Sequence, residues 1–278
     1  MNKELGVLLS RLHESKPLIH HITNYVTVND CANITLGIGA SPIMADAIEE
    51  AADIAAISCA LVLNIGTLNE RIIPSMIAAG KSANAKGIPV VLDPVGVGAS
   101  TLRNDTAIRL INELKLSVLR GNISEIKFIA GLDSETKGVD ASESDISKID
   151  DAGQIAKGLA SKYDCTVAIS GAVDIISDGN KIFNIKNGHP MLGNLSGTGC
   201  MCSSLIGSFC GASPDEVFIA SVAAMACMGV AGEDAYNAIK QVKSDGQRKQ
   251  ASFHIALLDA VSCMEGDYFE GRVKYHEA

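Results

Sequence analysis

A glycine-rich stretch around residue 198 has the composition of an anion-binding turn. Gly197 and Gly199 flank Thr198, and the chain then continues into small and apolar residues of helical character. The first turn of a helix carries unpaired N–H groups and the positive end of the helix dipole, and glycine gives an anion such as phosphate close access to that backbone. We therefore expect an anion to lie near residues 197–200.

Cys200 falls in the first turn of this predicted helix. The positive helix end favours a thiolate over a thiol, which makes Cys200 a candidate base or polarising group. The alternative is that the glycines only start a tightly packed helix and that Cys200 is a small buried apolar residue, the commoner role of a cysteine. This segment alone leaves both interpretations open.

The rest of the chain alternates helical segments with apolar runs that end in polar or glycine clusters. This alternation predicts a parallel sheet covered by helices on both faces, in which ligands bind at the carboxyl ends of the strands. Residues at those ends include Asn64, Asp93 and Arg120. The apolar runs are 57–66, 88–98 and 116–122, and helices are expected around Leu5–Leu12, from a cap at Asn29 through Ile38, and over 46–56, 69–86, 101–115, 123–130 and 148–163.

The second half of the chain adds features that a purely parallel sheet lacks. Asp178-Gly179 separates two β-rich runs, which predicts a hairpin and antiparallel strands at one edge of the sheet. The polar stretch 131–147 is expected to be a surface excursion, and helices are expected over about 214–239 and 250–265. The chain holds no long linker or fixed-period repeat, so we expect one domain over residues 1–278.

Bulk composition excludes some classes of function. The 278 residues carry a net charge of −9 with no cluster of Lys and Arg, which argues against nucleic acid as the main partner. The hydrophobic content is 47% and the aromatic content 4%, so the core is expected to be aliphatic and rich in Ala and Gly. An anionic substrate would need local help from helix ends and metal.

Cysteine usage and apolar runs indicate a cytoplasmic protein without membrane association. The eight cysteines are scattered through apolar segments without the paired spacing of a zinc site or a disulfide framework, which indicates a reducing compartment. The N-terminal leucines are interrupted by charges, unlike a secretion signal. The uncharged run 217–232 is short for a membrane span and suits a buried helix.

Two adjacent histidines suggest a metal site at first sight. His20 and His21 stand on a predicted extended segment, where neighbouring side chains point to opposite faces and cannot readily share one ion. Packing or hydrogen bonding is the preferred interpretation. Cys200 and Cys202 have the same difficulty on a helix, and no partner pair is placed to complete a tetrahedral site.

Several ordered motifs resemble the hydroxyethylthiazole kinase family of the ribokinase-like superfamily, over nearly the whole chain. They are HHITNYVTVNDCAN, GASPIMADAIEEA, VLDPVGVGAS, LRGNISEI, AISGAVDIISDG and GTGC. The resemblance implies a ribokinase-like three-layer fold, with a mostly parallel central sheet, helices on both faces and an antiparallel edge hairpin. It also implies transfer of the γ-phosphate of ATP to the hydroxyl of 4-methyl-5-(2-hydroxyethyl)thiazole in thiamine salvage, with Mg²⁺, by a homotrimer whose active sites lie at subunit interfaces.

The resemblance assigns ligand contacts to individual residues. Met44 and Gly197 would contact the substrate, and a polarizable thioether suits a flat sulfur heterocycle, although a methionine filling a core gap is the alternative. Arg120 and Ser170 would contact ATP, since a planar guanidinium fits phosphate oxygens and a hydroxyl can hydrogen-bond. The turn 197–200, including Thr198 and Gly199, would supply backbone N–H groups to the transferring phosphoryl group.

The resemblance also places a metal-binding element after the strand that ends near residue 122. Asn122 and Glu125 form the superfamily's N-x-x-E element, one helical turn apart on the same face, so both would reach a hydrated Mg²⁺. Their other interpretation is a helix cap, and the two are compatible. Asp93, at the end of an apolar strand, is a further candidate for a magnesium-bound water or for phosphate-side electrostatics.

One residue departs from the superfamily pattern. Many ribokinase-like enzymes have an aspartate base where this chain has Cys200. Phosphoryl transfer depends mainly on positioning and charge stabilisation, so a weaker base at this position need not abolish activity. Our hypothesis is that Cys200 orients or deprotonates the substrate hydroxyl.

Two alternatives remain at this point. Hydroxymethylpyrimidine (phosphate) kinases can share the G-T-G-C turn, but the N-terminal segment of this chain resembles the thiazole branch. A non-catalytic ligand-binding protein on the same fold is the other alternative. The presence of Arg120, Asn122, Glu125 and Cys200 argues against it.

Overall fold

The structure is a computed structural model that describes residues 2–132, 146–240 and 249–277. Its centre is a nine-stranded sheet with the order β2-β1-β3-β4-β5-β6-β7-β8-β9. Strands β2 to β6 in this order pair in parallel, and β6, β7, β8 and β9 pair antiparallel. The strands are β1 (Leu18–Ile22), β2 (Ser41–Ile43), β3 (Ala60–Asn64), β4 (Val90–Asp93), β5 (Val118–Asn122), β6 (Thr166–Ser170), β7 (Asp174–Ser177), β8 (Ile182–Ile185) and β9 (Tyr275–Glu277).

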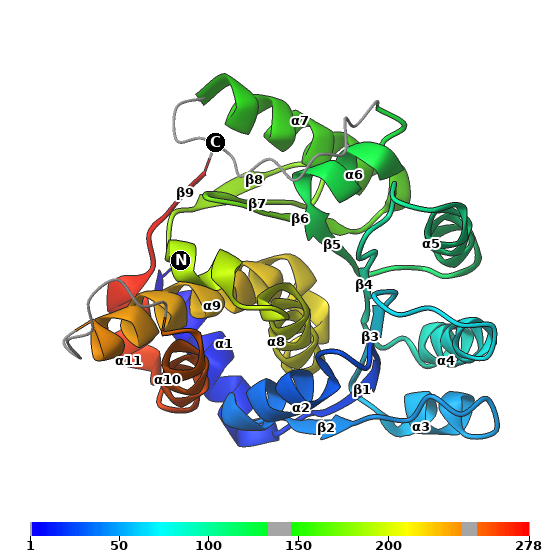
Figure 1. Cartoon of the computed structure of the whole chain (residues 1–278), viewed down its shortest axis with the longest axis horizontal. Helices are drawn as coiled ribbons and strands as arrows, with labels where there is room; N and C mark the ends of the chain where they lie inside the picture. Colours follow the sequence, from blue (N-terminus) through cyan, green and yellow to red (C-terminus); the bar gives the residue numbers. More distant parts are fainter. Residues whose placement is uncertain (1, 133–145, 241–248, 278) are drawn as a thin grey trace.

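Helices cover both faces of this sheet and make three layers (Figure 1). Each face has its own buried apolar cluster. One layer holds α3 (Ala51–Ile57), α4 (Ile72–Lys86), α5 (Thr101–Glu113), α6 (Ile123–Ile129) and α7 (Ile146–Tyr163). The other holds α1 (Asn2–Ser15), α2 (Val28–Gly37), α8 (Thr198–Ala212), α9 (Val217–Ile239), α10 (Gln250–Ser262) and α11 (Gly266–Arg272), with the short 3-10 helices η1 (Pro190–Asn194) and η2 (Pro214–Glu216). The predicted three-layer fold class is confirmed.

The predicted hairpin is also confirmed. Strands β7 and β8 pair antiparallel around a turn in which Asp178 Oδ1 accepts from the backbone N–H groups of Asn180 and Lys181 at 2.8 and 2.7 Å. Gly179 has a φ of 91°, a left-handed conformation that glycine adopts without strain. The antiparallel strands therefore lie at one edge of the sheet, as expected.

Several boundaries differ from the sequence-based expectations. Helix α2 begins after Thr27, and Asn29 lies inside it, where its Oδ1 accepts from Asn33 one turn later. The helix expected over 46–56 is shorter, because a separate turn with an Ala47–Glu50 hydrogen bond precedes α3. The last expected helix ends at Ser262 and is followed by α11. Most of the excursion expected over 131–147 lies outside the described residues.

Two edge strands were missed for a common reason. Strand β2 contains Pro42, which as a sequence signal marks a break, but an edge strand tolerates a residue without an N–H donor. Strand β9 has only three residues, too few for a recognisable alternation. Short strands of this kind form because a neighbouring strand offers an unpaired edge.

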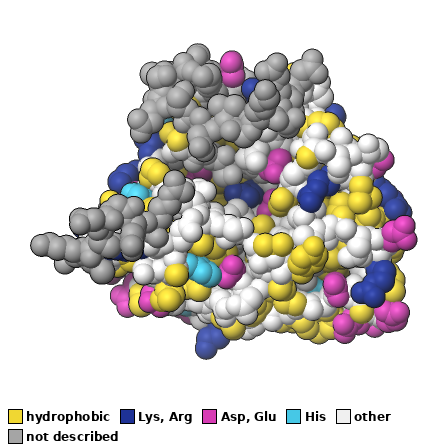
Figure 2. Space-filling model, in the orientation of Figure 1, with side chains coloured by type: hydrophobic (Ala, Val, Ile, Leu, Met, Phe, Trp, Pro, Cys, Tyr) yellow, Lys and Arg dark blue, Asp and Glu magenta, His cyan; other side chains and the backbone are white. Residues whose placement is uncertain are grey.

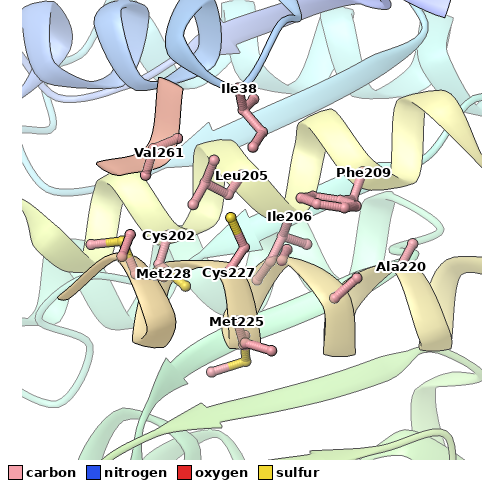
Figure 3. Packing of buried hydrophobic residues seen from close by; sticks show 14 of the residues in the cluster. Ile38, Cys202, Leu205, Ile206, Phe209, Ala220, Met225, Cys227, Met228 and Val261 are labelled. Carbon is pink, nitrogen blue, oxygen red and sulfur yellow. The ribbon is translucent and has the colours of Figure 1, made fainter. Parts of the chain in front are cut away.

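Helices α8 and α9 form the interior of one layer. Figure 3 shows Leu205 and Ile206 of α8 facing Cys227 and Met228 of α9. In the part of the chain that the structure describes, residues 214–239 form the one helix long and apolar enough to cross a membrane, and 72% of its most apolar window is buried within the protein. The prediction of a buried helix over 217–232 is confirmed.

Close packing of α8 on the sheet depends on Gly207. A Gly→Ala substitution at this position should therefore change the stability of the protein in the opposite direction from one at an unpacked helix position. A Cβ at Gly207 would lie 2.4 Å from Cγ2 of Val62 in β3, whereas a Cβ at Gly158 in α7 would contact nothing within 4 Å. We expect Gly207→Ala to lower the free energy of unfolding by about 1–3 kcal/mol through overpacking. Gly158→Ala, the matched control, should raise it by roughly 0.5–1 kcal/mol through helix propensity. Urea denaturation measures both, and equal effects would contradict the packing argument.

Candidate functional site

The carboxyl ends of four neighbouring parallel strands meet the start of α8. Asn64 and Asp93 are register partners on β3 and β4, and Asn122 and Ser170 are register partners on β5 and β6. Because the strands are parallel, their ends share one edge of the sheet, and the polar residues predicted to mark that edge come together there. This edge is the candidate site.

The start of α8 has the backbone expected of an anion-binding turn. Gly197 is the N-cap with a φ of 91°, and a Cβ there would lie 2.6 Å from Cγ2 of Thr27. The first intrahelical hydrogen bond runs from Met201 N to Gly197 O at 2.8 Å, so the N–H groups of residues 198–200 precede it and point out of the helix start. The Thr198 hydroxyl donates to Leu192 O at 3.0 Å, which ties this turn to the preceding loop.

Arg120 lies directly beneath this turn. Its side chain is 9% exposed, and Nη2 donates to Ser170 Oγ at 2.9 Å. A Cβ at Gly199 would lie 2.8 Å from Arg120 Nη1, so the glycine allows the guanidinium to approach the helix start closely. The structure thus brings Arg120, Ser170 and Gly199 together, as the resemblance implied.

Asp93 is the buried partner of Arg120. Its Oδ2 lies 3.6 Å from Arg120 Nη1 and accepts from Ser203 Oγ at 2.7 Å and from Asn64 Nδ2 at 2.9 Å. Burial raises the pKa of the Asp93 carboxyl, and the charge of Arg120 opposes that rise. Oδ1 of Asp93 is buried and has no hydrogen-bond partner among the described residues, so this carboxylate retains acceptor capacity.

Asn122 and Glu125 form the helix cap that was the alternative interpretation. Asn122 Oδ1 accepts from Glu125 N at 3.0 Å, and Glu125 Oε2 accepts from Asn122 N at 2.8 Å. The other Glu125 oxygen accepts from Gly96 N at 2.8 Å. Burial raises the pKa of Glu125, and the nearby Asp93 charge adds to the effect. The cap does not test the metal-binding role, which remains a prediction.

A hydrated cation suits this group of residues better than a directly ligated one. No set of three or more His, Cys, Asp or Glu side chains gathers as a metal cage in the described ranges. Asp93 and Glu125 are nevertheless two buried carboxylates close enough to interact electrostatically, and Asp93 has a free acceptor. Mg²⁺ usually keeps several waters and uses one or two carboxylates together with phosphates, so the residues present fit it.

Cys200 is partly exposed and accepts hydrogen bonds from two asparagine side chains. Asn24 Nδ2 lies 3.2 Å and Asn64 Nδ2 3.3 Å from Cys200 Sγ. Sequence reasoning noted Asn64 at a strand end without giving it a role, and it missed Asn24 and Ser203. Asn64 had the position of its strand as a signal, whereas Asn24 lies in a loop whose path depends on the whole fold.

The remaining predicted contacts lie at the margin of the site. Met44 directly follows the edge strand β2, so it lies at the same end of the sheet but outside the hydrogen-bonded network.

His20 on β1 bonds through Nε2 to Ala45 O at 2.7 Å, and His21 bonds to Thr35 Oγ1 at 3.3 Å. Burial lowers the pKa of both histidines, that of His21 to about 3. The expectation that these histidines form hydrogen bonds is confirmed.

Charge on the surface is mixed in sign. On the face in Figure 2, coloured Lys and Arg side chains are interspersed with acidic and apolar ones. A polyanion would require a continuous basic surface. An anionic ligand at this site would instead be held by the α8 helix start and the buried Arg120.

Comparison with known structures first defines the class of protein. The pyridoxal kinase from Staphylococcus aureus, solved with AMP-PCP and pyridoxal, has a TM-score of 0.62 at 14% identity, covering 95% of this chain and 98% of that one. A hydroxyethylthiazole kinase protein from Pyrococcus horikoshii OT3 has a TM-score of 0.85 at 35% identity, covering 99% of both chains. The fold is therefore ribokinase-like.

Sequence comparison then defines the family. The model of the Hydroxyethylthiazole kinase family matches residues 9–267. Curated relatives with the name hydroxyethylthiazole kinase include one from Ruminiclostridium cellulolyticum, 56% identical over 99% of this chain and 98% of its own, and one from Clostridium beijerinckii, 58% identical over 99% and 97%. The chain belongs to the hydroxyethylthiazole kinase family, a family of kinases.

The buried ion pair predicts an effect on stability that an exposed pair would not have. Arg120→Ala would leave Asp93 as an uncompensated buried carboxylate, and we expect a loss of about 3–5 kcal/mol in the free energy of unfolding. Arg109→Ala, which breaks an exposed pair with Glu113, should cost less than about 1 kcal/mol. Urea denaturation of the two variants compares them, and similar losses would show that Arg120 does not neutralise Asp93.

Proposed function

We propose that the protein transfers the γ-phosphate of ATP to the hydroxyl of 4-methyl-5-(2-hydroxyethyl)thiazole, as a step of thiamine salvage. Membership of the family supports this substrate, and the names of the curated relatives agree with it. The observation that carries the proposal is the meeting of the α8 helix start, buried Arg120 and partly exposed Cys200 at one edge of the sheet. These groups supply an anion site, a phosphate-binding cation and a proton acceptor.

The N–H groups of residues 198–200 and Arg120 have the charge needed to stabilise a transferring phosphoryl group. In the proposed reaction, the substrate oxygen attacks the γ-phosphorus while the bond from that phosphorus to the leaving ADP oxygen breaks. The hydroxyl proton moves to Cys200 Sγ. Backbone donors and a guanidinium at a partly buried site stabilise the charge that spreads over the phosphoryl oxygens. Ser170 orients the guanidinium through its hydrogen bond, and Met44 and Gly197 would contact the thiazole.

Mg²⁺ belongs to this proposal as the cation that neutralises the phosphates when bound. Asp93, Asn122 and Glu125 would hold it through its water shell. The backbone hydrogen bonds at Glu125 keep both carboxylate oxygens oriented without a metal.

We further propose that residues 1–278 act as one kinase domain in the cytoplasm. We also propose that three chains assemble with active sites at their interfaces. Light scattering of the purified protein would test the number of chains.

An ATP-consumption assay tests the proposed substrate. We expect ADP to form with the thiazole alcohol and Mg²⁺, and mass spectrometry to detect 4-methyl-5-(2-phosphooxyethyl)thiazole. The hydroxymethylpyrimidine alcohol should react much more slowly, and addition of EDTA should remove the activity until Mg²⁺ is restored. Faster turnover of the pyrimidine alcohol would contradict the proposed substrate, and no turnover of either alcohol would favour a non-catalytic ligand-binding role.

Substitution of Cys200 tests its part in the chemistry. Cys200→Ala removes the proton acceptor, and we expect kcat to fall by about 100-fold, the lower range of general-base contributions. Cys200→Asp supplies a carboxylate in the same position and should keep kcat near or above that of the unmodified protein. Steady-state kinetics measure both variants. If kcat is unchanged in both, Cys200 has no chemical role.

A further inference from the structure

Two asparagine side chains next to Cys200 have all their hydrogen-bonding atoms engaged. Asn24 Oδ1 accepts from Thr27 N and Thr27 Oγ1, each at 3.1 Å. Asn24 Nδ2 donates to Asn64 Oδ1 at 3.1 Å and to Cys200 Sγ at 3.2 Å. The side chain is 4% exposed, so solvent does not compete for these atoms.

Asn64 repeats this arrangement from the end of β3. Its Oδ1 accepts from Gly66 N at 2.9 Å as well as from Asn24. Its Nδ2 donates to Asp93 Oδ2 at 2.9 Å and to Cys200 Sγ at 3.3 Å. Asn64 is 2% exposed. Each buried amide therefore directs one N–H at the sulfur and uses the other to hold its neighbour.

The neighbours determine which amide atom faces the sulfur. The backbone N–H groups of Thr27 and Gly66 can only donate, so each must face an amide oxygen. A flipped Asn24 would set its NH₂ group against the Thr27 N–H, and a flipped Asn64 would set its oxygen against the Asp93 carboxylate. Both alternatives are unfavourable at low exposure, so the NH₂ groups face Cys200.

We propose that Asn24 and Asn64 are positioning residues that hold the Cys200 sulfur as a hydrogen-bond acceptor and favour its thiolate form. Hydrogen bonds to a charged acceptor are stronger than those to a neutral one, so two fixed N–H donors stabilise the thiolate relative to the thiol. In the reaction this thiolate takes the proton of the substrate hydroxyl as that oxygen bonds to phosphorus. The reaction step rests on the proposed function, whereas the state of the sulfur does not.

Asn64 has a second effect, because it separates two anionic groups. Its NH₂ group lies between the Asp93 carboxylate and the Cys200 sulfur and donates to both. A thiolate formed beside Asp93 without an intervening donor would be repelled by the carboxylate. The amide converts this repulsion into two hydrogen bonds, and it does so without adding net charge.

Alkylation of the ligand-free protein tests the sulfur directly. Iodoacetamide reacts with thiolates, and mass spectrometry of the Cys200 peptide measures the rate at neutral pH. Asn24→Asp keeps an oxygen for Thr27 but replaces the donor by a carboxylate, and we expect alkylation at Cys200 to slow by about tenfold. Cys263 is exposed and provides an internal reference whose rate should not change.

Two further variants exclude trivial explanations. Asn24→Ala enlarges the space beside the sulfur, so slower alkylation in this variant as well cannot be steric. Asn33→Asp changes an exposed asparagine on α2, whose Nδ2 donates to Asn29, and should leave Cys200 alkylation at the rate of the unmodified protein. Thermal unfolding establishes that the compared variants are folded.

Kinetics separate this proposal from the proposed function. With the thiazole alcohol, Asn24→Asp and Asn24→Ala should lower kcat by about tenfold and leave the KM for ATP unchanged, because the nucleotide contacts lie on Arg120 and α8. Unchanged Cys200 alkylation in both folded variants would overturn the proposal. If the alkylation rate falls as expected while the unmodified protein phosphorylates no thiazole alcohol, the proposed function fails and the assignment of the two amides is supported.

Discussion

The candidate site depends on one buried ion pair, between Asp93 at the end of β4 and Arg120 in β5. An isolated ion of either sign would be very costly at this depth, and its partner together with hydrogen-bond donors offsets that cost. The pair is not symmetric in its surroundings. Besides its ion pair with Arg120, Asp93 accepts hydrogen bonds from Asn64 and Ser203. Arg120 directs one nitrogen toward Ser170 and lies beneath the α8 turn. A positive group is thereby held at the place where an anion would meet the helix start.

The position of that helix start follows from small residues. Gly207 and Gly211 of α8 lie so close to β1 and β3 that a Cβ on either would approach strand side chains within 3 Å. Such close contact fixes the distance of α8 from the sheet, and Ser203 then reaches Asp93 from the helix side. The same packing that excludes water from the core therefore directs the N-terminus of α8 at the strand ends. Stability and the geometry of the site have a common origin here.

Local patterns predicted the fold better than the site. Alternation of apolar runs and helical segments identified the parallel strands, and Asp178-Gly179 identified the hairpin, because each depends on neighbours in sequence. Strand β2 and the cap at Thr27 were missed because tertiary contacts overrode a proline signal and an asparagine preference. Asp93 and Arg120 were noted because parallel strands deliver their last residues to one edge, whereas Ser170 was assigned only through the family resemblance. The contacts of Asn24 with Asn64 and Cys200 join segments 40 and 176 residues away in sequence, and no local pattern encodes them.

The role of Cys200 is best understood together with the side-chain amides of Asn24 and Asn64, which donate hydrogen bonds to its sulfur. An aspartate at this position would be ionised in water at neutral pH without help, whereas a free thiol is mostly protonated there. A helix start alone attracts any anion, including the phosphate that we propose to bind in the same region, so its positive end does not act on the sulfur alone. Side-chain N–H groups that point at Sγ and are out of reach of a phosphate avoid this competition between the two anions. The amides of Asn24 and Asn64 have that property, since their remaining atoms are held by Thr27, Gly66 and Asp93. The network thus gives the sulfur its own donors and leaves the backbone N–H groups of α8 available to the phosphate in the proposed reaction.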